Sequence, residues 1–152
     1  MSDYAVNVTH TGGLSFEVSN GRTTLATDWD PQDQSWLATE LFLASLGACM
    51  LATLVDYAQT HDLDVRGATV EVTADTEVRP MRMGRIFVTY RLPDTLTPQQ
   101  VEALVRAGDR CKVHNTITHH PEFVVQAETV AVETIDVGSR EGSQASSRTM
   151  GA

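Results

Sequence analysis

Residues 37–59 read LATELFLASLGACMLATLVDYAQ, and this stretch decides which fold the chain adopts. Its leucine, alanine, phenylalanine and methionine residues are spread around every side of a helix, and Glu40 and Asp56 are its only charged residues. A helix that is apolar all round is a buried helix rather than an amphipathic surface helix. We therefore expect a long buried helix here, with Ser35 or Thr39 as its N-cap.

The length and the apolar character of this helix also suit a membrane span. The surrounding chain is acidic and places no lysine or arginine beside the helix, so we expect burial inside protein and no membrane. A chain of 152 residues is of ordinary single-domain size and has little material to wrap such a helix on all sides. We therefore expect a homodimer in which the partner covers one face.

Strand patterns lie on both sides of the helix. Before it, alternating apolar residues and a Gly12-Gly13 and an Asn20-Gly21 turn predict a three-stranded meander over residues 4–8, 14–18 and 23–26. After it, we expect strands at 65–77 and 85–92 with a turn at 81–84, a helix from Thr97 to Gly108 begun by a capping box, and a last strand at 123–135. The order predicts an α+β fold with antiparallel sheets.

The polar, pattern-free sequence from residue 137 onward predicts a disordered C-terminal tail, so we expect one domain over 1–136 and a tail over 137–152. The 20 acidic and 11 basic residues leave a formal charge of −9, which argues against nucleic-acid binding. The first residues lack the basic and apolar regions of a signal peptide, and we expect a cytoplasmic protein.

The two cysteines, Cys49 and Cys111, are the main candidates for chemistry. Cys49 lies in the apolar helix, where burial would raise its pKa and make it inert. Cys111 stands between Arg110 and Lys112, and flanking cations favour a thiolate, so the local sequence makes Cys111 the more acidic of the two. The alternative is that both cysteines are core residues and that the two cations simply face water.

Glu40 is the carboxylate nearest to Cys49 along the helix, and in the first turn it could merely complement the helix dipole. Nine residues on a straight helix span about 13.5 Å and turn Glu40 to the opposite face from Cys49. The two can share a site only if the helix breaks between them, at Gly47 or near its start.

Three histidines follow the second cysteine at His114, His119 and His120. Their spacing matches no common structural zinc pattern. No phosphate-binding glycine loop, dinucleotide fingerprint or Ser/His/Asp signature is present in the sequence. We expect neither a metal nor a cofactor.

Two segments together are similar to one known family. The run TELFLASLGAC at residues 39–49 resembles the helix motif of the OsmC/Ohr family, the osmotically inducible and organic hydroperoxide resistance proteins. The run AGDRCKVHNTI at residues 107–117 resembles the segment that carries the family's second cysteine. The similarity covers roughly residues 4–135 and is closest to the general OsmC-like branch.

The resemblance implies an intertwined homodimer, in which antiparallel sheets from both chains wrap the long central helices. It also implies thiol-dependent reduction of organic hydroperoxides or hydrogen peroxide. In that reaction the Cys49 thiolate attacks the peroxide, Cys111 resolves the resulting sulfenic acid as a disulfide, and an external dithiol restores both thiols. Glu40 falls at a position where the general branch commonly has a glutamate.

Four positions depart from the pattern of the resembled family. The hydroperoxide branch has an activating arginine after the Gly-Gly pair of the first hairpin, where this chain has Leu14, and Arg22 is the nearest replacement. Thr39 stands where that branch has a glutamate, and Ala38 and Lys112 stand where prolines usually precede the helix motif and follow the second cysteine. A second hypothesis therefore stays open, a non-catalytic OsmC-like dimer that binds a small hydrophobic ligand and keeps its cysteines as core residues.

Overall fold

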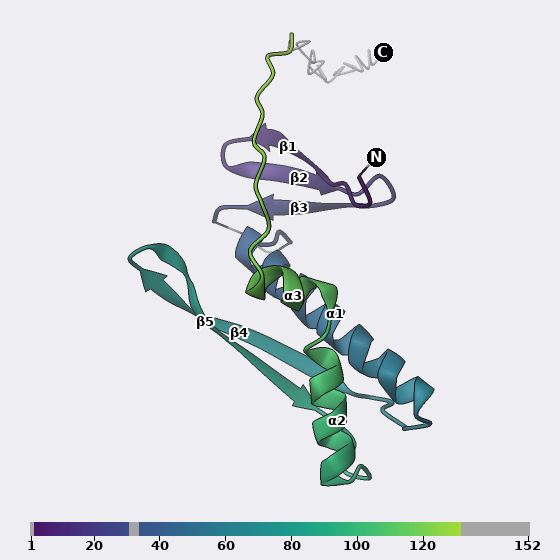
Figure 1. The fold of residues 1–152 in the computed structure, drawn as a ribbon. Helices are drawn as coiled ribbons and strands as arrows, with labels where there is room; N and C mark the ends of the chain where they lie inside the picture. The colour runs from purple at the N-terminus through teal and green to yellow at the C-terminus, as the bar shows by residue number, and fades with distance from the viewer. Residues whose placement is uncertain (1, 31–33, 132–152) are drawn as a thin grey trace, which may run out of the picture. The chain divides into compact units, whose positions relative to one another are not determined.

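The computed structural model describes residues 2–30 and 34–131, and it combines antiparallel strands with helices as the sequence predicts (Figure 1). The described residues up to Pro121 belong to one compact unit, and residues 122–131 belong to a second. The elements, in chain order, are β1 (Asn7–Gly12), β2 (Ser15–Ser19), β3 (Thr24–Asp28), α1 (Ala38–Thr60), β4 (Thr69–Val78), β5 (Met81–Arg91), α2 (Pro98–Gly108) and α3 (Lys112–Thr118). The predicted α+β class is confirmed.

The first three strands form the antiparallel meander that the turn residues predict, in the order β1-β2-β3. Val8 lies opposite Val18, and Phe16 lies opposite Thr27. The first strand begins at Asn7 rather than Tyr4, and every residue of β1 is exposed. Backbone hydrogen bonds between β3 and Trp36 connect this sheet to the start of α1.

Helix α1 runs without a break over 23 residues, but its N-cap differs from the prediction. The cap is Leu37 rather than Ser35 or Thr39, and Leu37 has no side-chain acceptor. The Glu40 carboxylate makes the reverse contact of a capping box, because it accepts a hydrogen bond from the Leu37 backbone N–H at 2.9 Å. An acidic group in the first turn also complements the helix dipole.

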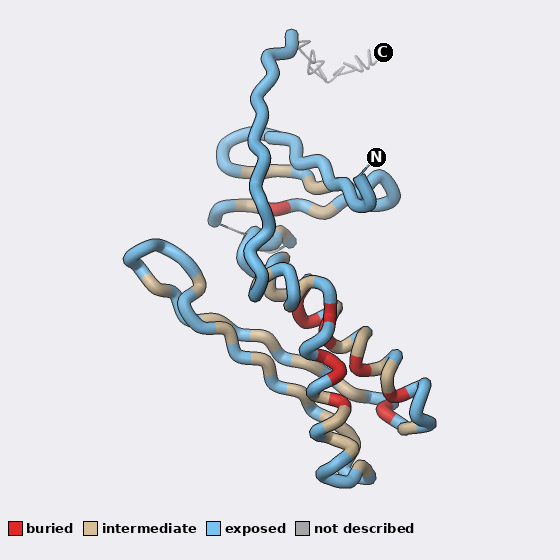
Figure 2. The backbone as a smooth tube through the Cα atoms, viewed as in Figure 1, coloured by how far each residue is buried: buried red, intermediate tan, exposed pale blue. Residues whose placement is uncertain are grey.

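Only one stripe of α1 is buried within the chain, although the sequence predicts burial on every side (Figure 2). This stripe packs against β4, α2 and α3. Its residues are Leu46, Gly47, Met50, Leu54 and Ala58. Elsewhere on the helix, Phe42 is 36% exposed and Ala48 and Ala52 are exposed. By length and composition α1 would suffice to cross a membrane, a property that it shares with core helices of soluble proteins.

Gly47 is a point of close approach and not a break in α1. A Cβ atom placed on Gly47 would lie 2.9 Å from Cγ2 of Val72 in β4, which is closer than packed carbon atoms tolerate. The absent side chain therefore lets the helix lie directly on the β4–β5 hairpin.

The β4–β5 hairpin is longer than the sequence predicts, and its turn lies at Arg79-Pro80 rather than at residues 81–84. Proline has no N–H for a strand ladder, which suits it to the turn. Gly84 lies within β5, where Asp75 pairs with Arg85 and Thr76 pairs with Met83, so that Gly84 is the extra residue of a bulge. The sequence signal of Gly84 therefore marked a bulge and not the turn.

Helix α2 begins with the predicted capping box. Thr97 accepts a hydrogen bond from the Gln100 backbone N–H at 3.3 Å, and Gln100 accepts one from the Thr97 N–H at 2.8 Å. The helix ends at Gly108, as expected. The short helix α3 that follows was not predicted, and Cys111 is its N-cap.

The sequence predicts a strand at 123–135. The described residues of this segment form no strand, and residues 122–131 have no regular secondary structure. Its side chains are exposed, Phe123 by 84% and Val125 by 89%. β-branched residues favour a strand, but a strand forms only where a sheet edge pairs with its backbone. Residues 132–135 and the predicted tail over 137–152 lie outside the described residues.

Leu54 and Leu104 are fully buried in a core cluster between α1 and α2. We expect Leu54→Ala to lower the free energy of unfolding by about 2–5 kcal/mol, because it leaves a cavity that its neighbours fill only partly. Urea titration followed by circular dichroism measures this loss. Leu14→Ala is the control, since Leu14 is 59% exposed and should change the value by less than about 0.5 kcal/mol. Equal losses for the two variants would contradict this core.

Candidate functional site

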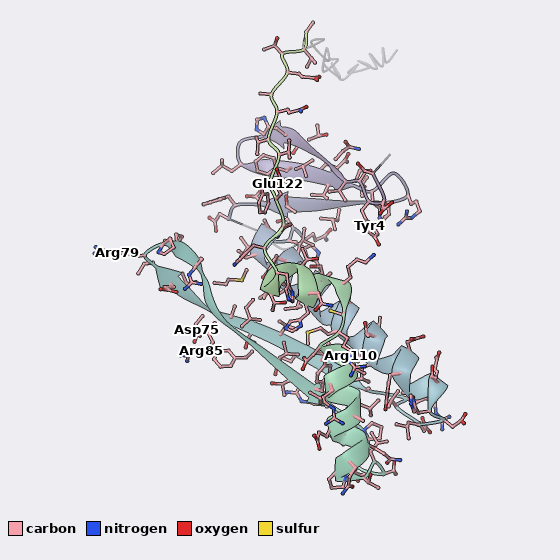
Figure 3. The ribbon with its side chains drawn as sticks, in the orientation of Figure 1. Tyr4, Asp75, Arg79, Arg85, Arg110 and Glu122 are labelled. Atoms are coloured by element: carbon pink, nitrogen blue, oxygen red, sulfur yellow. The ribbon has the colours of Figure 1, made fainter. Side chains whose placement is uncertain are left out.

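The fold brings the two cysteines into one cluster, although 62 positions separate them. Leu46, Met50 and Cys111 form a buried group, and Cys49 packs against it. The cluster lies where α3 contacts α1, and Figure 3 draws the side chains of this region with sulfur in yellow. Both thiols are free.

The burial of the two cysteines is the reverse of what the local sequence indicates. Cys111 is 2% exposed, whereas Cys49 is only partly buried. Burial raises the pKa of the Cys111 thiol; a hydrogen bond from the His114 backbone opposes this, and the neighbouring Cys49 side chain raises it further. The expectation that Cys111 is the acidic thiol is therefore wrong, because Arg110 and Lys112 are exposed and do not offset its burial.

Backbone geometry fixes the Cys111 sulfur at the start of α3. Sγ accepts a hydrogen bond from the His114 N–H at 3.2 Å. The His114 ring bonds through Nδ1 to the Asp109 carbonyl oxygen at 2.7 Å, which holds the turn between α2 and α3. Cys111 is thus a buried thiol on a rigid corner, turned toward α1.

The structure does not bring Glu40 to the cysteines. Because α1 is continuous, its nine-residue separation from Cys49 corresponds to about 13.5 Å along the helix. Glu40 lines a separate cavity of about 280 Å³ with Gly47 and Val72. A catalytic role for Glu40 stays a prediction, while its bond to Leu37 accounts for its place at the helix start.

Arg22 lies in the β2–β3 turn, where its backbone N–H donates to the Asn20 side chain at 3.0 Å. The recorded hydrogen bond of Arg22 is made by its backbone and involves neither cysteine. His114 and His119 bond to backbone carbonyls, His114 Nδ1 to the Asp109 oxygen at 2.7 Å and His119 Nδ1 to the Asn115 oxygen at 3.1 Å. In residues 2–30 and 34–131, no three His, Cys, Asp or Glu side chains are grouped as metal ligands.

A cavity of about 790 Å³ lies beside the cysteine cluster. Leu46 and Met50 of α1 form part of its wall, and the remainder comes from β5, the β5–α2 loop, α2 and α3, with the polar residues Asp94, Asp109 and His114 among apolar side chains. The volume is in the range of small-molecule binding sites. The cysteines themselves are not among the lining residues, so the cavity and the thiols share a wall.

Tyr90 is the unusual polar group of this cavity. Its hydroxyl oxygen is buried and has no hydrogen-bond partner among the described residues. Burial, followed by the charges of Asp109 and Cys111, raises the pKa of Tyr90 to about 12, which keeps the hydroxyl protonated as a donor. A side chain at Gly108 would collide with this hydroxyl, so the glycine makes room for it. The sequence pattern of the predicted strand at 85–92 gave no signal for this role of Tyr90.

Family comparison agrees with the fold and with the arrangement of the two cysteine segments. Residues 31–126 match the model of the OsmC-like protein family. This chain belongs to the OsmC-like family. The matched region contains α1 and both cysteines.

Solved structures share the OsmC-like fold at low sequence identity. The OsmC-like protein of Mycoplasma pneumoniae has a TM-score of 0.70 and 17% identity, over 78% of this chain and 89% of its own. A putative osmotic stress induced and detoxification response protein of Psychrobacter arcticus has 0.68 and 21%, over 76% and 89%. The organic hydroperoxide resistance protein OhrB of Bacillus subtilis has 0.59 and 17%, over 78% and 94%. No curated protein matches the chain by sequence.

The raised pKa of Cys111 predicts a difference in reactivity between the two thiols. Because a raised pKa keeps the thiol protonated, iodoacetamide should modify Cys111 at neutral pH at least about tenfold more slowly than Cys49, which is also more exposed. Peptide mass spectrometry over a time course measures both rates in the same sample. Denatured protein is the control, in which the rates should converge. Faster labelling of Cys111 in the native protein would contradict this assignment.

Proposed function

We propose that this OsmC-like protein is a thiol-dependent peroxidase that reduces organic hydroperoxides or hydrogen peroxide. The observation that carries the proposal is the pairing of a partly exposed Cys49 with a buried Cys111 in one cluster. A reactive thiol must be reachable by peroxide, and a resolving thiol must lie beside it. The hydroperoxide resistance named for the Bacillus subtilis protein supports the choice of substrate class.

The reaction begins with attack of the Cys49 thiolate on one peroxide oxygen. A sulfur–oxygen bond forms, the O–O bond breaks, and the leaving alkoxide takes a proton and departs as an alcohol, or as water when the substrate is hydrogen peroxide. Cys49 is then a sulfenic acid. The raised pKa of Cys111 keeps this thiol protonated up to this step, so that Cys49 and not Cys111 attacks the peroxide.

Resolution joins the two sulfurs. Cys111 loses its proton and attacks the sulfenic sulfur, an S–S bond forms, and hydroxide leaves and is protonated to water. An external dithiol then reduces the Cys49–Cys111 disulfide by two exchange steps and is itself oxidised to a disulfide. This cycle suits a reducing cytoplasm, in which we place the protein.

We further propose that the working form is a homodimer. The exposed side of α1 carries Phe42, Ala48 and Ala52, and residues 122–131 expose a run of apolar β-branched side chains. An apolar helix face and an unpaired strand-like segment are surfaces that a second copy would cover. Neither nucleic acid nor a membrane is a proposed partner, given the charge of −9.

The cavity beside Tyr90 favours a second candidate function. Its apolar wall and its unpaired buried donor suit a small hydrophobic ligand with one hydrogen-bond acceptor. In this alternative the cysteines are core residues, and peroxide leaves both thiols unchanged.

One equivalent of organic hydroperoxide should convert the wild-type protein to the Cys49–Cys111 disulfide, because the two thiols share one cluster. Intact mass spectrometry detects the loss of two hydrogen atoms, and peptide mapping locates the bond. Cys49→Ser should abolish peroxide consumption with dithiothreitol or a lipoyl dithiol as reductant. Cys111→Ser is the matched variant, which should stop at a sulfenic acid that dimedone traps on Cys49.

Two outcomes separate the functions. Full peroxide consumption by Cys49→Ser would overturn the peroxidase mechanism. Two unmodified thiols after peroxide treatment would favour the hydrophobic-ligand alternative. Saturable binding of an environment-sensitive apolar dye to the wild-type protein, and loss of that binding in Tyr90→Phe, would support this alternative.

The proposed dimer predicts twice the chain mass in sedimentation equilibrium. Ala52→Glu should shift the protein toward the monomer by at least about tenfold in dissociation constant, because it places an unpaired charge in an apolar interface. Gln99→Glu on α2 adds a similar charge at an exposed position and is the control. A monomeric wild type, or a dimer unaffected by Ala52→Glu, would contradict the proposed interface.

A further inference from the structure

The cavity and the cysteine cluster are built largely from the same side chains. Six hydrophobic residues line the cavity of about 790 Å³ and also form or contact the buried group that contains Cys111. These shared residues are Leu46, Met50, Ile86, Val88, Tyr90 and Ile117. A molecule bound in the cavity therefore contacts the side chains that bury the Cys111 sulfur.

Cys111 is reached by a reagent only when the packing around it opens, because it is 2% exposed. Helix α3, which packs against α1, is the least anchored part of this packing (Figure 1). It has seven residues and none of them is buried, and residues 122–131 beyond it have no regular secondary structure. Elements with few buried contacts open at low cost in free energy. We therefore expect displacement of α3 from α1 to be the opening that exposes Cys111.

The cavity lies between the part that opens and the part that stays in place. His114, Ile117 and Thr118 of α3 line it on one side, and α1, β5 and α2 supply the other walls. A ligand in the cavity contacts both sides and binds only while α3 is closed. Such a ligand favours the closed form by a factor of 1 + [L]/Kd. Occupancy of the cavity thus lowers the population in which Cys111 is exposed.

Polar groups at the end of α2 indicate what the cavity binds. The Tyr90 hydroxyl is buried and has no acceptor among the described residues, and a side chain at Gly108 would collide with it. In the next residue, the Asp109 carbonyl oxygen lies 2.7 Å from His114 Nδ1. A carbonyl oxygen only accepts hydrogen bonds, so Nδ1 carries the proton and Nε2 of the neutral ring is an acceptor. Tyr90 therefore offers a donor and His114 an acceptor to a ligand.

This pair of groups suits a hydroxyl, which accepts from Tyr90 and donates to His114. The acidic side chains in the wall are Asp94 and Asp109, and no lysine or arginine of the described chain lines the cavity. Two carboxylates disfavour a ligand that is itself an anion. The apolar remainder of the wall suits a hydrocarbon body. The chemistry of the cavity therefore favours a neutral apolar alcohol over a fatty-acid anion.

We propose that the cavity binds a neutral apolar alcohol and that the bound alcohol holds α3 closed over Cys111. The ligand site and its effect on α3 need no peroxide and are properties of the reduced protein. One consequence rests on the proposed function. Reduction of an organic hydroperoxide releases an alcohol, and an alcohol that stays in the cavity protects the resolving thiol.

Isothermal titration calorimetry of the reduced full-length protein with octan-1-ol tests the ligand site. We expect saturable binding of a single molecule per chain. Octanoate has the same chain length and should bind at least about threefold more weakly at neutral pH, because Asp94 and Asp109 repel it. Tyr90→Phe should weaken octan-1-ol binding at least about fivefold, because the buried hydroxyl of the ligand loses its donor.

Iodoacetamide labelling of the wild-type protein, followed by peptide mass spectrometry, tests the effect on α3. Octan-1-ol at about ten times its dissociation constant should slow the labelling of Cys111 about tenfold. Labelling of Cys49 should change much less, because Cys49 is only partly buried. Hydrogen exchange at the backbone amides of α3 should slow together with the labelling of Cys111.

A cavity-filling variant reproduces occupancy without a ligand. Val105 lines the cavity and does not belong to the group packed around Cys111. Val105→Phe should weaken octan-1-ol binding and slow the labelling of Cys111 in the absence of alcohol. Gln99→Phe adds the same ring at an exposed position of α2 outside the cavity wall and should change neither property. Circular dichroism of each variant verifies that the fold is intact.

The outcomes distinguish this inference from the proposed function. Absence of saturable octan-1-ol binding would overturn the ligand site. Binding by the diluted monomer alone would show that a second copy fills the cavity and would overturn it as well. Octan-1-ol binding that leaves the labelling of Cys111 unchanged would contradict closure of α3, even in an active peroxidase. Binding with protection of Cys111 in a protein that consumes no peroxide would support this inference and overturn the peroxidase proposal.

Discussion

The candidate site depends on one contact, in which the turn between α2 and α3 that carries Cys111 packs against one turn of α1. Leu46 and Met50 form the surface of α1 against which this turn packs, and Cys111 is buried between them and the start of α3. Burial of apolar surface holds this contact, since no ion pair crosses it within the described residues. The same contact brings Cys49 beside Cys111 and forms one wall of the cavity.

The two thiols differ in their burial. Desolvation holds Cys111 in its protonated form, whereas Cys49 stays reachable from solvent. Two identical side chains thus acquire different chemistry from their surroundings alone. The Tyr90 hydroxyl is buried without a hydrogen-bond partner among the described residues, and Tyr90 lines the adjoining cavity.

The uncovered apolar surface and the core both come from the hydrophobic pattern of the sequence. The sequence pattern of α1 predicts burial on every side, and the chain buries one stripe while Phe42 and Ala52 stay exposed. The β-branched residues after Pro121 predict a strand, and none forms over 122–131. A hydrophobic pattern reports that a face avoids water, but it does not report whether the same chain or a second copy covers that face.

The sequence by itself determined the strands and helices from β1 to α2 and their order, because those follow from local patterns, whereas it missed α3 and predicted a strand that does not form over 122–131. The capping box at Thr97, the hairpin turn at Asn20-Gly21 and the apolar run of α1 each act within a few residues. Two motifs in order also indicated the family. Only the tertiary structure decided which cysteine is buried and that Tyr4 contacts Lys112 across 108 positions. Burial and charge depend on neighbours that are distant in sequence. The local sequence therefore predicted an acidic Cys111, whereas burial in the folded protein raises its pKa.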